Sequence, residues 1–182
     1  TLAERIASWG SALNLDAVPV DVCHVAKRCI VDLVGVTMAA THHSLSQRIL
    51  DHAGQVYASG PATVLGSRHR LSPVGAALVN GAVGHALDFD DTSYTGIMHG
   101  STVALPAALA ATEAVGGDGR RLLEAFVVGS EVTYAIALLC TTNHYFKGWW
   151  STATCGAFGA AAAAAKALGL SAVETTSALA LA

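Results

Sequence analysis

Three carboxylates gather in one short polar stretch near the middle of the chain. Asp88, Asp90 and Asp91 stand within four residues, directly after a glycine-rich apolar segment. Carboxylates this close repel one another unless a cation, a bound proton or hydrogen-bond donors compensate their charge. A carboxyl group that keeps a proton in such a setting suits general acid–base chemistry. This stretch is therefore the first candidate for a catalytic site.

An imidazole and a hydroxyl belong to the same stretch. His99 precedes Ser101, which we expect to cap the next helix, so its ring is expected near the positive end of that helix. The free N–H groups of a helix N-terminus would also bind a carboxylate ligand. Thr92 can donate or accept a hydrogen bond in the same place. Together these groups indicate acid–base chemistry on a small carboxylate.

Two other interpretations of these residues stay open. Aspartates often fill solvated turns, so the cluster could be a simple turn that ends a helix. Alternatively, His85, Asp88, Asp91 and His99 offer nitrogen and oxygen ligands for a divalent metal ion, as in a metal-dependent hydrolase. The chain has no H-E-x-x-H motif, however, and its Asp-Asp pair lacks a later acidic partner. We predict no metal and no other cofactor, and a packing or supporting role for His85.

A second loop, from Thr141 to Trp150, carries aromatic and basic side chains. Trp149 and Trp150 follow Lys147 just before a small-residue segment. Such side chains could line a substrate pocket, or the aromatic rings could plug a gap between helices. We predict substrate-binding roles for Lys147 and Trp150.

The elements that must position these loops are helices. Apolar residues recur at helical spacing, and capping residues, prolines and glycines mark the helix ends. Thr63–Leu65 is the one expected extended piece, too short to build a sheet. The expected helices start at Thr1, Pro19, Ser44, Ser72, Ser101, Asp118, Ser151 and Ser171, and five of their ends fall at Gly60–Pro61, about Asp88, Gly116–Gly117, Leu139 and Leu168.

Composition excludes several classes of protein. Of the 182 residues, 53% are hydrophobic and only 13% are charged, with a net charge of −3 and no basic stripe, so we expect no nucleic-acid partner. No stretch has the length and apolarity of a membrane span. Four cysteines without a C-x-x-C pair fit a reducing, cytoplasmic setting. The last helix carries no stop signal, so we expect residues 1–182 to be an incomplete helical domain.

Several segments together resemble the MmgE/PrpD family, which includes 2-methylcitrate dehydratase, cis-aconitate decarboxylase and iminodisuccinate epimerase. The similarity lies in N-G-A-V-G-H-A-L-D-F-D-D-T at 80–92, H-G-S at 99–101, G-S-E-V at 129–132 and the stretch 144–170 with G-W-W-S-T-A-T-C-G-A-F-G-A-A. These segments match in order and spacing along essentially the whole chain.

The resemblance implies an all-α domain, a smaller α+β lid domain and further helices beyond this chain, and homodimers. It also implies metal-free acid–base chemistry on di- or tricarboxylates. Carried onto this sequence, it predicts Asp88, Thr92 and His99 as catalytic residues. We add Asp91 and Ser101 as expected substrate-binding residues.

The chain departs from the family pattern at three places. Trp150 stands where the family usually has the histidine of G-W-H, Gly100 replaces the proline of H-P-S, and Ser93 follows Thr92 where His or Trp is common. The family's catalytic Lys and a later His and Tyr lie beyond Ala182, so this stretch alone is expected to be inactive.

The sequence therefore predicts a lyase of the 2-methylcitrate dehydratase type, which removes a proton next to a carboxylate and expels water. Decarboxylation and epimerisation use similar carbanion chemistry and remain alternatives. A non-catalytic member that keeps the fold for assembly is a further alternative, suggested by Trp150. Few basic groups are present to hold substrate carboxylates, so we expect the lid to supply them.

Overall fold

The computed structural model describes residues 1–182, apart from the side chain of residue 141, and it is a helical domain. The helices are α1 (Leu2–Ala12), α2 (Val20–Ala39), α3 (Ser44–Val56), α4 (Pro73–Gly84), α5 (Ser101–Ala114), α6 (Gly119–Phe146), α7 (Ser151–Leu168) and α8 (Ala172–Leu181). Short 3₁₀ turns lie at Leu15–Ala17 and Ala40–His42. The predicted all-α class is confirmed.

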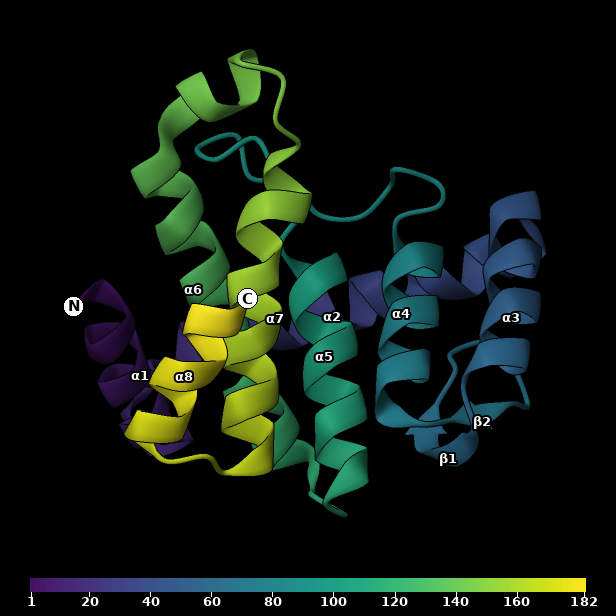
Figure 1. Ribbon diagram of the computed structural model, residues 1–182, viewed down its shortest axis with the longest axis horizontal. Helices are drawn as coiled ribbons and strands as arrows, with labels where there is room; N and C mark the ends of the chain where they lie inside the picture. The colour runs from purple at the N-terminus through teal and green to yellow at the C-terminus, as the bar shows by residue number, and fades with distance from the viewer.

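Helix α5 lies in the middle of the domain, between α4 on one side and α7 on the other (Figure 1). Helix α2 crosses behind this layer and contacts α4, α5 and α6. The largest core cluster joins α2, α5, α6 and α7 and is built mainly from alanines with Leu33, Leu105 and Phe126. Small side chains let these helices approach closely, as the alanine- and glycine-rich composition predicts.

The closest helix contact is between α6 and α7, at two glycines. A Cβ atom on Gly129 would lie 2.7 Å from Cβ of Ala163, and one on Gly159 would lie 1.6 Å from Oγ1 of Thr133. No side chain fits there, because the space between each glycine and the facing helix is smaller than a methyl group. This contact fixes the position of α7 against α6.

One expected extended piece and three expected helix ends were wrong. A two-stranded antiparallel sheet forms from β1 (Ser59–Thr63) and β2 (Arg70–Leu71), where we expected only an isolated extended piece. Helix α3 ends at Val56 rather than at Gly60–Pro61, and α4 ends at Gly84 rather than near Asp88. Helix α6 continues to Phe146, so the second loop shortens to residues 147–150.

Most of the expected capping signals are confirmed, but Pro19 is the N-cap residue of α2 and not its first helical residue, and Gly100, not Ser101, is the N-cap residue of α5. Thr1 with Glu4 and Ser171 with Glu174 form capping boxes, and the side chain of Asp118 accepts a hydrogen bond from the N–H of Arg121. Gly169 ends α7 in the left-handed conformation, at φ 74°.

Within the part of the chain that the structure describes, one helical stretch, Gly119–Cys140, is long and apolar enough to cross a membrane. Of its most apolar window, 50% is buried inside the domain. Buried core helices meet the same criterion.

Candidate functional site

The polar stretch forms a loop between α4 and α5, at the same end of the domain as the α6–α7 connection (Figure 1). Backbone hydrogen bonds between Ser93 and Met98, of 2.8 and 3.2 Å, close the loop on itself. Met98 is fully buried against Ala137 and Cys155. The loop is thereby anchored to α6 and α7, and this anchor places the next residue, His99.

His99 lies at the centre of the predicted catalytic residues. Its Nε2 atom is 3.5 Å from Oδ1 of Asp88, and its Nδ1 atom is 3.4 Å from Oγ1 of Thr92. Its backbone N–H donates a 3.1 Å hydrogen bond to Oγ1 of Thr152, at the start of α7. The imidazole is mostly buried, with 13% of its side chain exposed. The structure therefore brings Asp88, Thr92 and His99 together.

Asp90 is the residue that sequence reasoning missed. Its carboxylate is fully buried, with Oδ1 2.9 Å from Nδ1 of His85 and Oδ2 3.4 Å from Nδ1 of His99. The two imidazole rings meet edge to face with their centroids 4.6 Å apart. An ionised carboxylate only accepts hydrogen bonds, so Nδ1 of His85 is the donor to Asp90. One buried carboxylate is thus shared by two histidines.

The loop geometry explains which aspartate points inward. Asp88 adopts the left-handed backbone conformation, at φ 53°, and 75% of its side chain is exposed. Aspartate tolerates this conformation better than most residues with a Cβ. The turn at Asp88 reverses the chain, so that Asp90 enters the interior while Asp88 stays at the surface beside His99. The types of residue in this stretch of sequence do not reveal such a turn.

Asp91 and Ser101 bind each other. The carboxylate of Asp91 accepts hydrogen bonds from the N–H and hydroxyl of Ser101, at 3.0 and 2.7 Å. Asp91 therefore caps the first turn of α5, as a capping side chain does. It faces a small pocket that also contains Cys29 and Tyr134, and does not line the pocket that His85 lines. Burial, followed by the charge of Asp91, raises the pKa of the Tyr134 phenol and of the Cys29 thiol.

Tyr134 also accounts for one departure from the family pattern. A Cβ atom on Gly100 would lie 2.2 Å from the Tyr134 hydroxyl and 2.4 Å from the ring carbon that bears it. A side chain at position 100 would require the Tyr134 ring to move. In this chain the tyrosine occupies the space that a larger residue before Ser101 would need.

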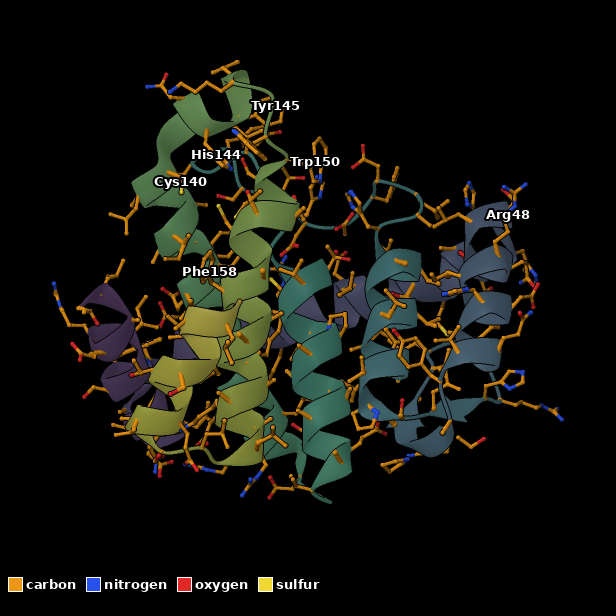
Figure 2. All side chains as sticks on the ribbon, in the orientation of Figure 1. Arg48, Cys140, His144, Tyr145, Trp150 and Phe158 are labelled. Carbon is orange, nitrogen blue, oxygen red and sulfur yellow. The ribbon has the colours of Figure 1, made fainter. Side chains whose placement is uncertain are left out.

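The two residues predicted from the second loop differ in their surroundings. Trp150 is 49% exposed, and its ring lies 6.3 Å from that of His85 and 6.2 Å from that of Tyr145, measured between centroids. Figure 2 shows Tyr145, His144 and Trp150 at the end of the domain that carries the site. Lys147 is exposed at the C-terminus of α6 and does not line the pocket beside His85.

A pocket of about 640 Å³ begins at this cluster. His85, Thr152 and Trp150 line it where α4 ends and α7 begins, and Ala and Gly residues of α4, α5 and α7 line most of the rest. Concave, mostly apolar pockets with a few polar groups are the usual form of small-molecule sites. Among the described lining residues there is no Lys or Arg, so cations for substrate carboxylates must come from elsewhere.

Four side chains of the cluster could reach one metal ion. His85, Asp88, Asp90 and His99 offer ligand atoms that all lie within 4.8 Å of one another. This set contains Asp90 in place of the Asp91 that we considered from the sequence. Each imidazole also lies within 3.5 Å of a carboxylate oxygen. The same side chains could therefore relay a proton without a metal ion.

Comparison with models of protein families identifies the family of this chain. The model of the MmgE/PrpD N-terminal domain matches residues 4–182. The chain belongs to the MmgE/PrpD family. The match confirms the resemblance that the sequence segments predicted, and it covers both the loop of the site and the start of α7.

Curated relatives of the family are named as decarboxylases. Human cis-aconitate decarboxylase is 33% identical over 100% of this chain and 39% of its own length, and the mouse enzyme is 31% identical over 100% and 38%. A cis-aconitate decarboxylase-like protein of Aspergillus oryzae is 29% identical over 98% of this chain and 39% of its own length. The chain spans about two fifths of the length of these relatives.

Proposed function

We propose that the protein containing this domain is a lyase that acts on a small di- or tricarboxylate, and that His99 transfers a proton during the reaction. The observation that carries the proposal is the position of the His99 imidazole, between Asp88, Asp90 and Thr92 and next to the pocket lined by His85. Asp88 and Asp90 stabilise an imidazolium, and Thr92 offers a hydroxyl to the same ring.

Decarboxylation is the reaction that we favour. The relatives described above are named as cis-aconitate decarboxylases or as decarboxylase-like, and they are 29–33% identical to this chain over the aligned residues. In this reaction the bond between carbon and a departing carboxylate breaks, CO₂ leaves and the remaining electron pair is quenched by a proton. A protonated imidazole supplies that proton.

Dehydration of a 2-methylcitrate-like substrate is the second candidate. A base takes the proton next to a carboxylate, the C–H electrons form a double bond, and the hydroxyl leaves as water after it accepts a proton. The site offers two adjacent imidazoles, which can act as base and as acid. Epimerisation would use the same proton removal followed by its return to the opposite face.

The substrate carboxylates require cations. We propose that the predicted lid domain supplies them, because the described residues that line the pocket include no Lys or Arg. We further propose that the whole protein is a cytoplasmic homodimer. Light scattering of the full-length protein would test the oligomeric state.

The deciding experiment uses the full-length protein with 2-methylcitrate, cis-aconitate and iminodisuccinate as separate substrates. We expect turnover of one of them and a loss of about 100-fold or more in kcat for His99→Ala. His52→Ala is the matched control, since His52 is exposed on α3, outside the site. Unchanged turnover in His99→Ala would reject the role of His99.

A non-catalytic assembly domain makes a different prediction. It would neither turn over these compounds nor bind them, whereas an enzyme site is stabilised by its ligands. Thermal denaturation in the presence of each carboxylate separates the two. A melting temperature that none of them raises, in a protein without turnover, would favour the assembly role.

A further inference from the structure

We infer that His85 is a second proton-transfer residue of this site and that Asp90 positions it; this inference rests on the proposed lyase function. From the sequence alone we expected only a packing or supporting role for His85. Three features of the structure assign it more: the way its ring is held, the carboxylate that it shares with His99, and its place in the wall of the pocket.

The ring of His85 is held by a hydrogen bond at one of its two nitrogens. Its Nδ1 atom donates to Oδ1 of Asp90 over 2.9 Å, and that carboxylate is fully buried. A proton on Nδ1 leaves Nε2 of the neutral ring as a bare acceptor. Among the described residues Nε2 has no hydrogen-bond or ion-pair partner, although the side chain lines the pocket and is 29% exposed. The ring is therefore fixed at Nδ1, and its other nitrogen is without a described partner in a residue that lines the pocket.

The second feature is the sharing of Asp90. Oδ2 of Asp90 lies 3.4 Å from Nδ1 of His99 but has no hydrogen-bond partner among the described residues, although it is buried. A buried carboxylate oxygen without a partner is costly, and protonation of His99 compensates it. The carboxylate can therefore stabilise a positive charge on either ring.

The two imidazole rings lie close enough to act on the same molecule. Their centroids are only 4.6 Å apart. Two imidazoles in this arrangement can provide an acid and a base side by side.

The proton balance of the proposed reactions uses such a pair. In dehydration, neutral Nε2 of His85 takes the proton from carbon, the C–H electrons form the double bond, and protonated His99 gives its proton to the leaving hydroxyl. In decarboxylation, the protonated ring delivers its proton to the carbon that receives the electron pair as CO₂ departs. The spent ring regains a proton from water in the next cycle.

Trp150 adds a condition that favours this role. Its ring lies 6.3 Å from that of His85, on the side where α7 begins. Trp150 and His85 line the same pocket, so the indole can contact a molecule bound beside the imidazole.

The experiment compares His85→Ala, His85→Gln and the control His52→Ala in the full-length protein. We expect both His85 variants to lose about 100-fold or more in kcat, with KM changed less than threefold. His85→Ala should also lower the melting temperature, because it leaves the buried Asp90 carboxylate without its donor, and His85→Gln should lower it less. Free imidazole added to His85→Ala should restore at least about tenfold of the lost rate, because it fits the space vacated by the ring. His52→Ala should behave as the wild type.

Glutamine separates a structural from a chemical role. Its amide can donate to Asp90 but cannot carry a proton to substrate. A His85→Gln variant with more than a third of the wild-type kcat, or a His85→Ala variant that imidazole does not rescue, would overturn the inference and leave the proposed function standing. A wild-type protein that turns over none of the three substrates would overturn the proposed function, and the inference with it.

Discussion

The carboxylate of Asp90 and the imidazole of His85 form a buried pair, joined over 2.9 Å at the point where α4 ends. His85 occupies the C-terminal cap of α4, and Asp90 returns to it from the loop after the turn at Asp88. The pair ties the start of the loop to the end of α4, and the buried Met98 anchors the other part of the loop.

The first prediction concerns the stability of this pair. Asp90→Ala removes the acceptor of the His85 Nδ1 proton and leaves a partly buried donor unpaired, so the free energy of unfolding should fall by about 1–3 kcal/mol. Urea denaturation measures the change. Asp51→Ala, on the exposed face of α3, should change it by less than about 0.5 kcal/mol. Equal effects of the two substitutions would contradict the prediction.

The second prediction separates Asp91 from Asp88. Because Asp91 caps α5 through Ser101, Asp91→Ala should lower the free energy of unfolding by about 1–2 kcal/mol and leave KM nearly unchanged. Asp88→Asn should do the reverse, with little effect on stability and a marked loss of kcat, because Asp88 is exposed and lies beside His99. A higher KM in Asp91→Ala without loss of stability would instead favour the substrate-binding role predicted from the sequence.

The third prediction tests the contact between α6 and α7. Gly159→Ala places a methyl group 1.6 Å from Oγ1 of Thr133, so we expect a loss of about 3 kcal/mol or more in the free energy of unfolding. Gly54→Ala, at an open helical position in α3, should raise it by about 0.5–1 kcal/mol. Thermal denaturation of both variants shows whether each substitution raises or lowers stability. A Gly159→Ala variant as stable as the wild type would show that the helices lie farther apart.

The fourth prediction concerns thiol reactivity. Burial raises the pKa of the Cys155 and Cys29 thiols above the ordinary value of 9.0, so little of either is ionised at pH 8. Only the thiolate reacts with iodoacetamide. Cys140 is exposed and should be alkylated first, with Cys155 and Cys29 protected until the protein unfolds. Mass spectrometry of partially labelled protein identifies the order, and early labelling of Cys155 would contradict it.

The fifth prediction is that activity does not require a metal. Since His85 and His99 each pair with a carboxylate, prolonged treatment with EDTA should leave kcat unchanged. Elemental analysis of the purified protein should find less than about 0.1 equivalent of a transition metal per chain. Loss of activity that added zinc or manganese restores would support the metal-dependent hydrolase considered from the sequence.

Local signals in the sequence were enough to predict most helices. Capping boxes, the glycine at the end of α7 and the Ser72–Pro73 start of α4 act within one turn of backbone, so residue types alone reveal them. The end of α6 escaped prediction because it depends on a distant segment. A ring nitrogen of His144 lies 2.7 Å from the Thr154 hydroxyl, and the ring stacks on Trp149. These contacts stabilise the last turns of α6, where the residue types alone indicate a loop.

The sequence was enough to predict which residues lie near one another in the site, but not which partner each of them contacts. Asp88, Thr92 and His99 lie together as expected, because the loop between two adjacent helices closes on itself. The choice between Asp90 and Asp91 was not predictable. It depends on the left-handed turn at Asp88 and on buried partners of each carboxylate, His85 for Asp90 and Ser101 for Asp91.

The hydrogen bond between the His99 backbone and Thr152 joins the loop to the first turn of α7. The same helix is pressed against α6 at Gly159 and carries Trp150 at its start. A small tilt of α7 about its glycine contact with α6 would therefore move the imidazole of His99 and the indole of Trp150 together. Substitutions in the interface between α6 and α7 would consequently shift His99 and Trp150 without any change in the residues of the acidic loop.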